Sequence, residues 1–157
     1  MQLRYTKRFF ILFIIILFFA GCGYPVFTDN GEKYIKELRN KNSCYEIFSG
    51  LREDTYEDSL GNSVYKKYIN IRITGCDNYL SYDNVDSNFN ALIPIASHLF
   101  NTCKNRSEFN GIVLEITTFS ESSFVKNYIF EYNPQSKTLD FKNRELEEPI
   151  FGMRTKK

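Results

Sequence analysis

The sequence predicts an α+β fold in which an antiparallel sheet of four to five strands carries two helices on one face. Two stretches space their apolar residues as a helix does, and five shorter ones alternate as strands do, in the order α-β-β-α-β-β-β. Runs of hairpins interrupted by single helices are typical of such two-layer domains. Residues 29–142 hold all of these stretches and have the length of a single domain.

The first helix is predicted over about residues 31–41. Tyr34, Ile35 and Leu38 follow one another there at helical spacing. Asp29 and Glu32 precede them at the spacing of a capping box, with Asp in place of the usual Ser or Thr.

Two half-buried strands are predicted next, over residues 44–51 and 64–74. Ile69, Ile71 and Ile73 alternate with polar residues and so share one face of the second strand. Residues 60–63 form the turn between the strands. Four acidic residues lead into that turn: Glu53, Asp54, Glu57 and Asp58.

The second helix is predicted to begin at Asp86 or Ser87 and to run to about Lys104. Pro94 lies inside this stretch, where it either kinks the helix or marks its start. The apolar stripe consists of Phe89, Leu92, Ile93, Ala96, Phe100 and Cys103.

Three further strands are predicted over residues 112–117, 124–132 and 139–141. Polar turns separate them, including Asn133 and Pro134 before the last strand. The remainder, residues 143–157, is charged and is expected to be a loosely ordered tail.

The N-terminal segment has the three regions of a secretory signal. Basic residues come first, an apolar run from Phe9 to Ala20 follows, and small residues end it. The ending Phe19-Ala20-Gly21-Cys22 resembles the lipobox of bacterial lipoproteins, with Phe19 where an aliphatic residue is usual. The resemblance implies that residues 1–21 are a signal peptide, that Cys22 is lipidated, and that residues 22–28 are a short membrane tether.

Lipidation at Cys22 implies attachment to the bilayer in the bacterial cell envelope, with the domain outside the cytoplasm and at the outer membrane in a Gram-negative cell. Cleavage without lipidation and an uncleaved membrane anchor are the alternatives. Twelve contiguous apolar residues are fewer than the roughly 20 that a spanning helix needs.

The charge balance argues against a nucleic-acid partner. The whole chain has 20 basic and 19 acidic side chains. Without Arg4, Lys7 and Arg8 of the signal segment, the basic side chains number 17, so no cationic field remains to attract phosphates.

Three cysteines remain after Cys22, and in an oxidising compartment two of them can form one bridge. The strand register that keeps the apolar faces together places Cys44 opposite Cys76, on the face away from the core. We therefore favour a Cys44–Cys76 disulfide over the pairings Cys76–Cys103 and Cys44–Cys103. Cys103 falls on the apolar stripe of the second helix, where a buried thiol behaves as a small hydrophobe.

No residue pattern in the sequence indicates catalysis, a cofactor or a metal. His98 is the only histidine and lies off the apolar stripe of its helix, so we interpret it as a solvated residue. Residues 86–97 match the first ligands of a calcium loop but have Ala91 and Ser97 where glycine and glutamate are needed.

We expect a non-catalytic, membrane-anchored envelope lipoprotein that binds an unknown protein. An inhibitor or immunity protein against a toxin or a cell-wall hydrolase is one alternative, and an envelope enzyme with an unrecognised site is another. Loops usually carry recognition. The expected contact surfaces are the 77–90 loop with Tyr79 and Tyr82, and the turn with Glu53, Asp54, Glu57 and Asp58.

Overall fold

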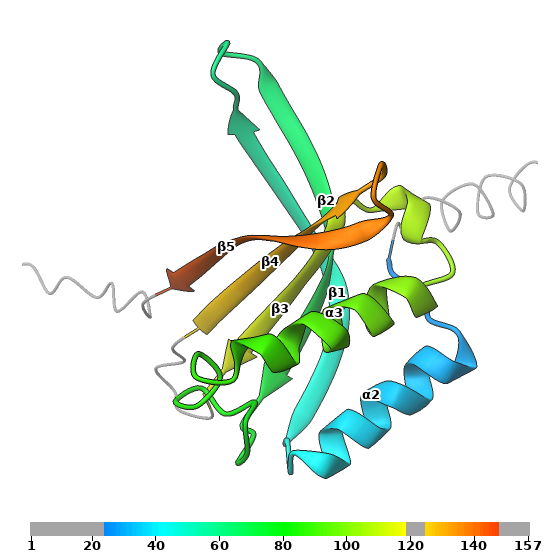
Figure 1. The fold of residues 1–157 in the computed structure, drawn as a ribbon, viewed down its shortest axis with the longest axis vertical. Coiled ribbons are helices and arrows are strands. Elements are labelled where there is room, and N and C mark those ends of the chain that lie inside the picture. The colour runs from blue at the N-terminus through cyan, green and yellow to red at the C-terminus, as the bar shows by residue number, and fades with distance from the viewer. Residues whose placement is uncertain (1–23, 119–124, 148–157) are drawn as a thin grey trace, which may run out of the picture.

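The structure is a computed structural model that describes residues 24–118 and 125–147. Five strands form one sheet in the order β1-β2-β3-β4-β5, and the α-helices α2 and α3 lie on one of its faces (Figure 1). This confirms the α+β class. In chain order the elements are α2 (Asp29–Lys41), β1 (Glu46–Glu57), β2 (Ser63–Thr74), the 3-10 helix η1 (Phe89–Ala91), α3 (Leu92–Thr102), the 3-10 helix η2 (Arg106–Glu108), β3 (Gly111–Thr117), β4 (Val125–Asn133) and β5 (Thr138–Glu147).

The prediction of an antiparallel sheet is wrong, because β2 and β3 run parallel, with Ile71 opposite Leu114. The other three strand pairs are antiparallel. The helix α3 causes the difference, since it carries the chain from the end of β2 back to the start of a strand beside it. The element order also differs from the expected one, because a 3-10 helix stands on each side of α3.

The helix α2 begins two residues before the predicted start, because its cap is Thr28 and not Asp29. The Thr28 hydroxyl oxygen accepts a hydrogen bond from the Gly31 amide at 3.3 Å. Asp29 and Glu32 lie in the first turn, where their negative charges favour the helix dipole.

The helix α3 starts close to Pro94, which lies in its first turn and therefore removes no intrahelical hydrogen bond. Its buried side is rotated from the predicted stripe. Ile93 is exposed, whereas Ile95 and Leu99 are buried together with Leu92, Ala96 and Phe100. The wrong start of the helix accounts for this, since η1 separates Phe89 from the regular α-helical turns.

The main core lies between the helices and the sheet. The central strands supply fully buried side chains from alternate positions, as their sequence pattern predicts. Burial of each such side chain contributes about 1.5–3 kcal/mol. These residues are Ile69, Ile71, Ile73, Ile112, Leu114, Ile116, Tyr128 and Phe130.

Two strands are longer than predicted. β1 continues to Glu57, so that three of the four acidic residues expected at the turn lie in the strand. β5 continues to Glu147, and residues 143–147 of the predicted tail therefore belong to the sheet. Residues 148–157 lie outside the described part of the chain.

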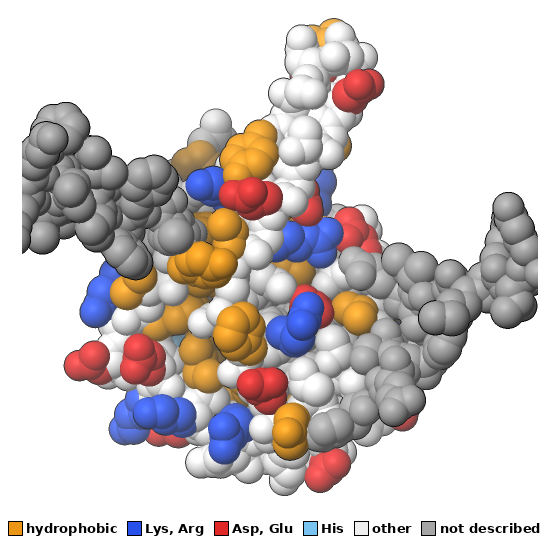
Figure 2. Space-filling model, turned by 180° about the vertical axis from the view of Figure 1, so that it is seen from behind, with side chains coloured by type: hydrophobic (Ala, Val, Ile, Leu, Met, Phe, Trp, Pro, Cys, Tyr) orange, Lys and Arg blue, Asp and Glu red, His pale blue; other side chains and the backbone are white. Residues whose placement is uncertain are grey.

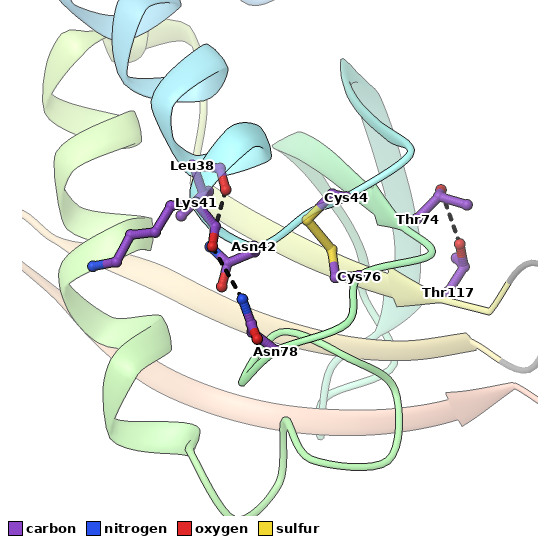
Figure 3. The surroundings of a disulfide bond; sticks show 8 residues. All are labelled: Leu38, Lys41, Asn42, Cys44, Thr74, Cys76, Asn78 and Thr117. Carbon is purple, nitrogen blue, oxygen red and sulfur yellow. Dashed lines mark hydrogen bonds between the residues drawn. A yellow bond between two sulfur atoms is a disulfide. The ribbon is translucent and has the colours of Figure 1, made fainter.

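Cys44 and Cys76 form a disulfide, the pairing favoured by the predicted register (Figure 3). That register is also observed, with Ile47 opposite Ile73 and Leu51 opposite Ile69. By the chain-entropy model, closing a loop of this length contributes about 3–4 kcal/mol.

The predicted location of the two cysteines on the outer face is wrong, because both are buried in the core cluster. They lie beyond the ends of β1 and β2, where alternation no longer decides the direction of a side chain. Hydrogen bonds surround them, from the Asn42 amide to the Leu38 carbonyl (2.9 Å) and from the Asn78 amide to the Lys41 carbonyl (3.0 Å; Figure 3).

We predict that Gly111→Ala is strongly destabilising. A Cβ atom at this position of β3 would lie 2.0 Å from the Phe130 carbonyl oxygen of β4. Because backbone atoms of the sheet cannot move aside easily, the cost is expected to be about 3 kcal/mol or more. Gly50→Ala is the matched control, since its Cβ would meet only the Phe48 ring at 3.4 Å. Equal urea midpoints for the two variants would contradict this prediction.

Candidate binding surface

The second face of the sheet is not covered by any helix of the described residues (Figure 2). Hydrophobic, basic and acidic side chains are interspersed on it. Each strand contributes side chains that point away from α2 and α3. We call this surface the concave face.

An ion pair between the outer strands shows that this face is curved. Nη2 of Arg52 on β1 lies 2.8 Å from a carboxylate oxygen of Glu145 on β5. Strands lie 4.7–4.9 Å apart, so a flat sheet would separate β1 from β5 by about 19 Å, more than these two side chains span. The sheet is therefore strongly curved, and the ion pair lies within its concavity.

A small apolar cluster lies at the bottom of the concave face. It consists of Tyr68, Val113 and Ile129, from β2, β3 and β4, and all three are buried. They are buried without a covering helix because the curvature brings side chains of the outer strands over them. The sheet thus has a second, smaller core on this side.

The charged groups around the cluster are paired. The Lys66 ammonium lies 2.6 Å from the Glu131 carboxylate, which also accepts a hydrogen bond from the Tyr68 hydroxyl at 3.0 Å. Burial raises the pKa of Glu131, but these two hydrogen bonds outweigh it and lower that pKa below its ordinary value. Burial and the bond to Glu131 raise the pKa of Tyr68, whose hydroxyl stays protonated.

The buried Glu115 carboxylate is held in the same way. One oxygen accepts from the Arg72 guanidinium at 2.6 Å and the other from the Asn70 amide at 2.8 Å. With its partners in place, the Glu115 carboxylate is a fixed hydrogen-bond acceptor. The two ion pairs, Lys66–Glu131 and Arg72–Glu115, are each neutral overall.

Two pockets are hollowed into the concave face. One, of about 360 Å³, is lined by Tyr45, Arg72, Glu115 and Thr117 at the disulfide end of the sheet. The other, of about 270 Å³, is lined by Tyr56, Tyr68, Glu131, Lys142 and Glu145. Both volumes lie near the lower end of the range of about 300–1,000 Å³ that small-molecule sites occupy.

The β1–β2 hairpin extends beyond the rest of the sheet (Figures 1 and 2). Residue pairing between β2 and β3 begins only at Tyr68, so residues 53–67 form a two-stranded segment that we call the arm. Leu60 at its tip is 83% exposed, and Tyr56 and Tyr65 are 45% and 52% exposed. These side chains contribute nothing to either core.

The four acidic residues predicted as a contact surface all lie on the arm, in different environments. Asp58 accepts hydrogen bonds from the backbone amides of Asn62 and Leu60 at 2.9 Å and so shapes the turn. The hydrogen bonds from Asn62, and then that from Leu60, lower the pKa of Asp58. Asp54 pairs with Arg52 at 2.9 Å. Glu53 binds the Tyr65 hydroxyl, and Glu57 is exposed at the end of β1.

The 77–90 loop holds its two predicted contact residues against the domain. Tyr79 packs partly buried on the main core. The Lys126 ammonium lies 4.0 Å above the centre of the Tyr82 ring and donates to the Tyr82 carbonyl. The loop and the tip of the arm lie at opposite ends of the molecule (Figure 1), so they do not form one surface.

Asp86 fixes the loop to the sheet. Its carboxylate accepts from the Tyr128 hydroxyl and pairs with Lys126 at 2.9 Å and with Arg144 at 2.7 Å. Burial raises its pKa, but these three donors outweigh it and lower the pKa to about 2. Asp86 is thus a structural anchor, which its sequence position before a helix did not indicate.

The remaining sequence candidates have ordinary surroundings. The ring of exposed His98 packs 4.1 Å from that of Tyr34, between α3 and α2. Cys103 is a buried free thiol, and burial raises its pKa. Cys22 lies outside the described residues.

The described residues contain no group of three or more His, Cys, Asp or Glu side chains placed to hold a metal ion. Within the same part of the chain, no helix has the length and apolar character needed to cross a membrane. Arg52, Tyr56 and Tyr65, which shape the concave face and the arm, were missed by the sequence analysis. The alternation of side chains through residues 52–56 was the available signal, but the charges there suggested a turn.

We predict that Asp86→Asn lowers the free energy of unfolding by about 1–3 kcal/mol at neutral pH, since it leaves the buried Lys126 without its carboxylate. The folded-state pKa of Asp86 lies below its ordinary 3.8, so its contribution is complete above about pH 4. That contribution declines as the pH falls toward 2. Denaturant titrations from pH 6 to pH 2 should show the difference from wild type shrinking.

Asp83→Asn is the control for this prediction, because Asp83 is an exposed carboxylate in the same loop with no ion-pair partner among the described residues. It should change stability little at any pH in this range. A constant difference between Asp86→Asn and wild type down to pH 2 would show that the carboxylate charge does not hold the loop.

No family model matches this chain, and neither does any curated protein or solved structure. The concave face and the arm are therefore the features from which a function can be argued.

Proposed function

We propose that this chain is a cell-envelope lipoprotein, attached to the bilayer through lipid on Cys22, whose domain binds another protein without catalysing a reaction. The arm and the adjoining concave face form the contact surface. Two kinds of observation support the proposal: the lipobox-like ending of the signal segment and the surface chemistry of the sheet.

The arm is the observation that carries the protein-binding part. A two-stranded segment that extends past its sheet is costly to order by itself, because an isolated hairpin is marginally stable in water. This one exposes Tyr56, Leu60 and Tyr65, and tyrosine is enriched in protein interfaces. Within the described residues no third strand covers either edge of the arm, which leaves backbone groups open to an added strand.

The concave face supports a protein ligand for a different reason. Several of its charges are already paired within the fold, as in Arg52–Glu145 and Lys66–Glu131. A surface with paired charges and tyrosine-lined pockets suits a mixed polar and apolar partner surface. It offers no concentrated charge for a polyanion such as nucleic acid.

The shape of the arm also favours the inhibitor version of this function. A narrow hairpin with an exposed leucine at its tip can enter a cleft of a partner, which a flat sheet cannot do. The partner would then be an enzyme of the envelope, such as a cell-wall hydrolase or a toxin.

We predict that the triple variant Tyr56→Ser, Leu60→Ser, Tyr65→Ser loses its partner in a pulldown from detergent-solubilised membranes. The melting curve should stay close to wild type, because these side chains are exposed and lie outside both cores. Ile93→Ser is the matched control, since it removes an exposed apolar side chain from α3 on the opposite side of the sheet.

Two further variants separate the surfaces named from the sequence. Changing Glu53, Asp54, Glu57 and Asp58 together tests the acidic side of the arm, and changing Tyr79 and Tyr82 together tests the loop. If the partner still binds the triple arm variant but no longer binds the loop variant, the binding surface lies at the other end of the molecule.

We predict that Cys22 carries the lipid. A bacterium that expresses the full chain with labelled palmitate should label the wild type but not Cys22→Ser. Several acyl chains on one N-terminus give stable attachment where a single chain gives only marginal binding. Equal labelling of the two proteins, or labelling of neither, would contradict the prediction.

A further inference from the structure

The segment Tyr24–Thr28, just after the expected lipid site, is fixed to the domain. The Val26 amide donates to the Asn105 side chain at 3.0 Å, and the Asn105 amide donates to the Tyr24 carbonyl at 3.0 Å. Backbone hydrogen bonds continue from Lys104 to Val26 (2.7 Å) and from Thr28 to Thr102 (2.9 Å). Residues 24–28 of the predicted tether are therefore part of the folded body.

Phe27 strengthens this attachment. Its side chain is buried in the main core, and its backbone forms an isolated antiparallel bridge with Cys103 at the end of α3. With Phe27 inward, the neighbouring Val26 points outward, and Tyr24 is on the same surface as Val26 by alternation. Tyr24 is 57% and Val26 51% exposed.

Two cations adjoin these exposed apolar side chains. Lys104 lies two residues after the end of α3, and its backbone amide donates to the Val26 carbonyl. Its ammonium has no ion-pair partner among the described residues. Arg106 begins η2 and is exposed, and its side chain donates to the neutral Asn101 side chain at 2.9 Å. We call Tyr24, Val26, Lys104 and Arg106 the N-terminal plate.

The N-terminal plate has the composition of a membrane-contacting surface. Tyrosine prefers the level of the lipid headgroups, where its ring is buried and its hydroxyl is hydrated. Lysine and arginine near an anionic bilayer surface each contribute about 1 kcal/mol of attraction. One acidic residue, Glu108, lies in η2 and offsets part of that charge.

The short chain length between Cys22 and Tyr24 determines that lipid on Cys22 would hold the plate close to the bilayer. Cys22 and Tyr24 are two residues apart, which a fully extended chain spans in about 7 Å. A domain fixed from Tyr24 onward and acylated at Cys22 has no slack with which to leave the bilayer surface.

We propose that the N-terminal plate rests on the lipid headgroups and gives the domain one orientation on the membrane. This inference depends on the proposed lipidation of Cys22. The arm extends away from the 24–28 segment, and the 77–90 loop lies at the opposite end of α3 (Figure 1). Membrane contact thus leaves the arm and the concave face open to a protein partner.

The orientation can be measured with fluorescent labels at two positions of the full-length acylated protein. Ser107→Cys puts a label in η2 beside the plate, and Leu60→Cys puts one at the tip of the arm. The protein is reconstituted in vesicles of phosphatidylethanolamine and phosphatidylglycerol that contain a headgroup-attached quencher. The label at 107 should be strongly quenched, and the label at 60 should lose little or no signal.

Labelling stays specific because Cys44 and Cys76 are bonded to each other and Cys103 is buried. The parent protein without an added cysteine measures any residual labelling. Lys104→Gln with Arg106→Gln, two changes of exposed side chains, should reduce the quenching at 107 in these anionic vesicles. Tyr24→Ser with Val26→Ser should reduce it as well.

Equal quenching at 107 and 60 in a protein that incorporates labelled palmitate would overturn the orientation while leaving the lipid anchor intact. Unchanged quenching at 107 in both pairs of variants would also overturn it, since the plate would then not be the contact. Absence of palmitate on the wild-type protein would overturn both the anchor and the orientation.

Discussion

The packing of α3 against the isoleucine-rich face of the sheet is the interaction on which the rest of this structure depends. Leu92, Ile95 and Leu99 cover that face, and the helix can lie there only if it crosses from β2 to a strand beside it. The crossing makes β2 and β3 parallel and places them at the centre of the sheet. One face is then covered by helices, and the helices of the described residues leave the other face open.

Curvature converts that second face from a flat surface into a concave one. An ion pair between the outermost strands, Arg52–Glu145, is possible only because the sheet bends toward it. The bend also buries Tyr68 and Ile129 without any helix above them. The concave face is thus a product of the whole sheet, and a change in any strand alters its shape.

The fold separates the surface that we propose for membrane attachment from the surface that we propose for protein recognition. Attachment is at the N-terminal plate, beside the end of α3, and recognition is on the arm and the concave face. Because residues 24–28 are bonded to the body, lipid on Cys22 would make the domain itself set the distance and direction from the bilayer to the arm. A flexible stalk would leave both undefined.

The sequence by itself determined the α+β class and the pairing of β1 with β2, and the proposed address in the cell envelope depends on it alone. Alternating residues such as Ile47 and Ile73 fix the register of a half-buried hairpin, because a slip of one residue would expose the whole apolar face. The disulfide follows from that register. Only the tertiary structure decided the parallel pairing, the curvature, the rotation of α3 that exposes Ile93, and the Arg52–Glu145 contact. Each of these depends on contacts between segments distant in the chain, and local periodicity carries no information about such contacts.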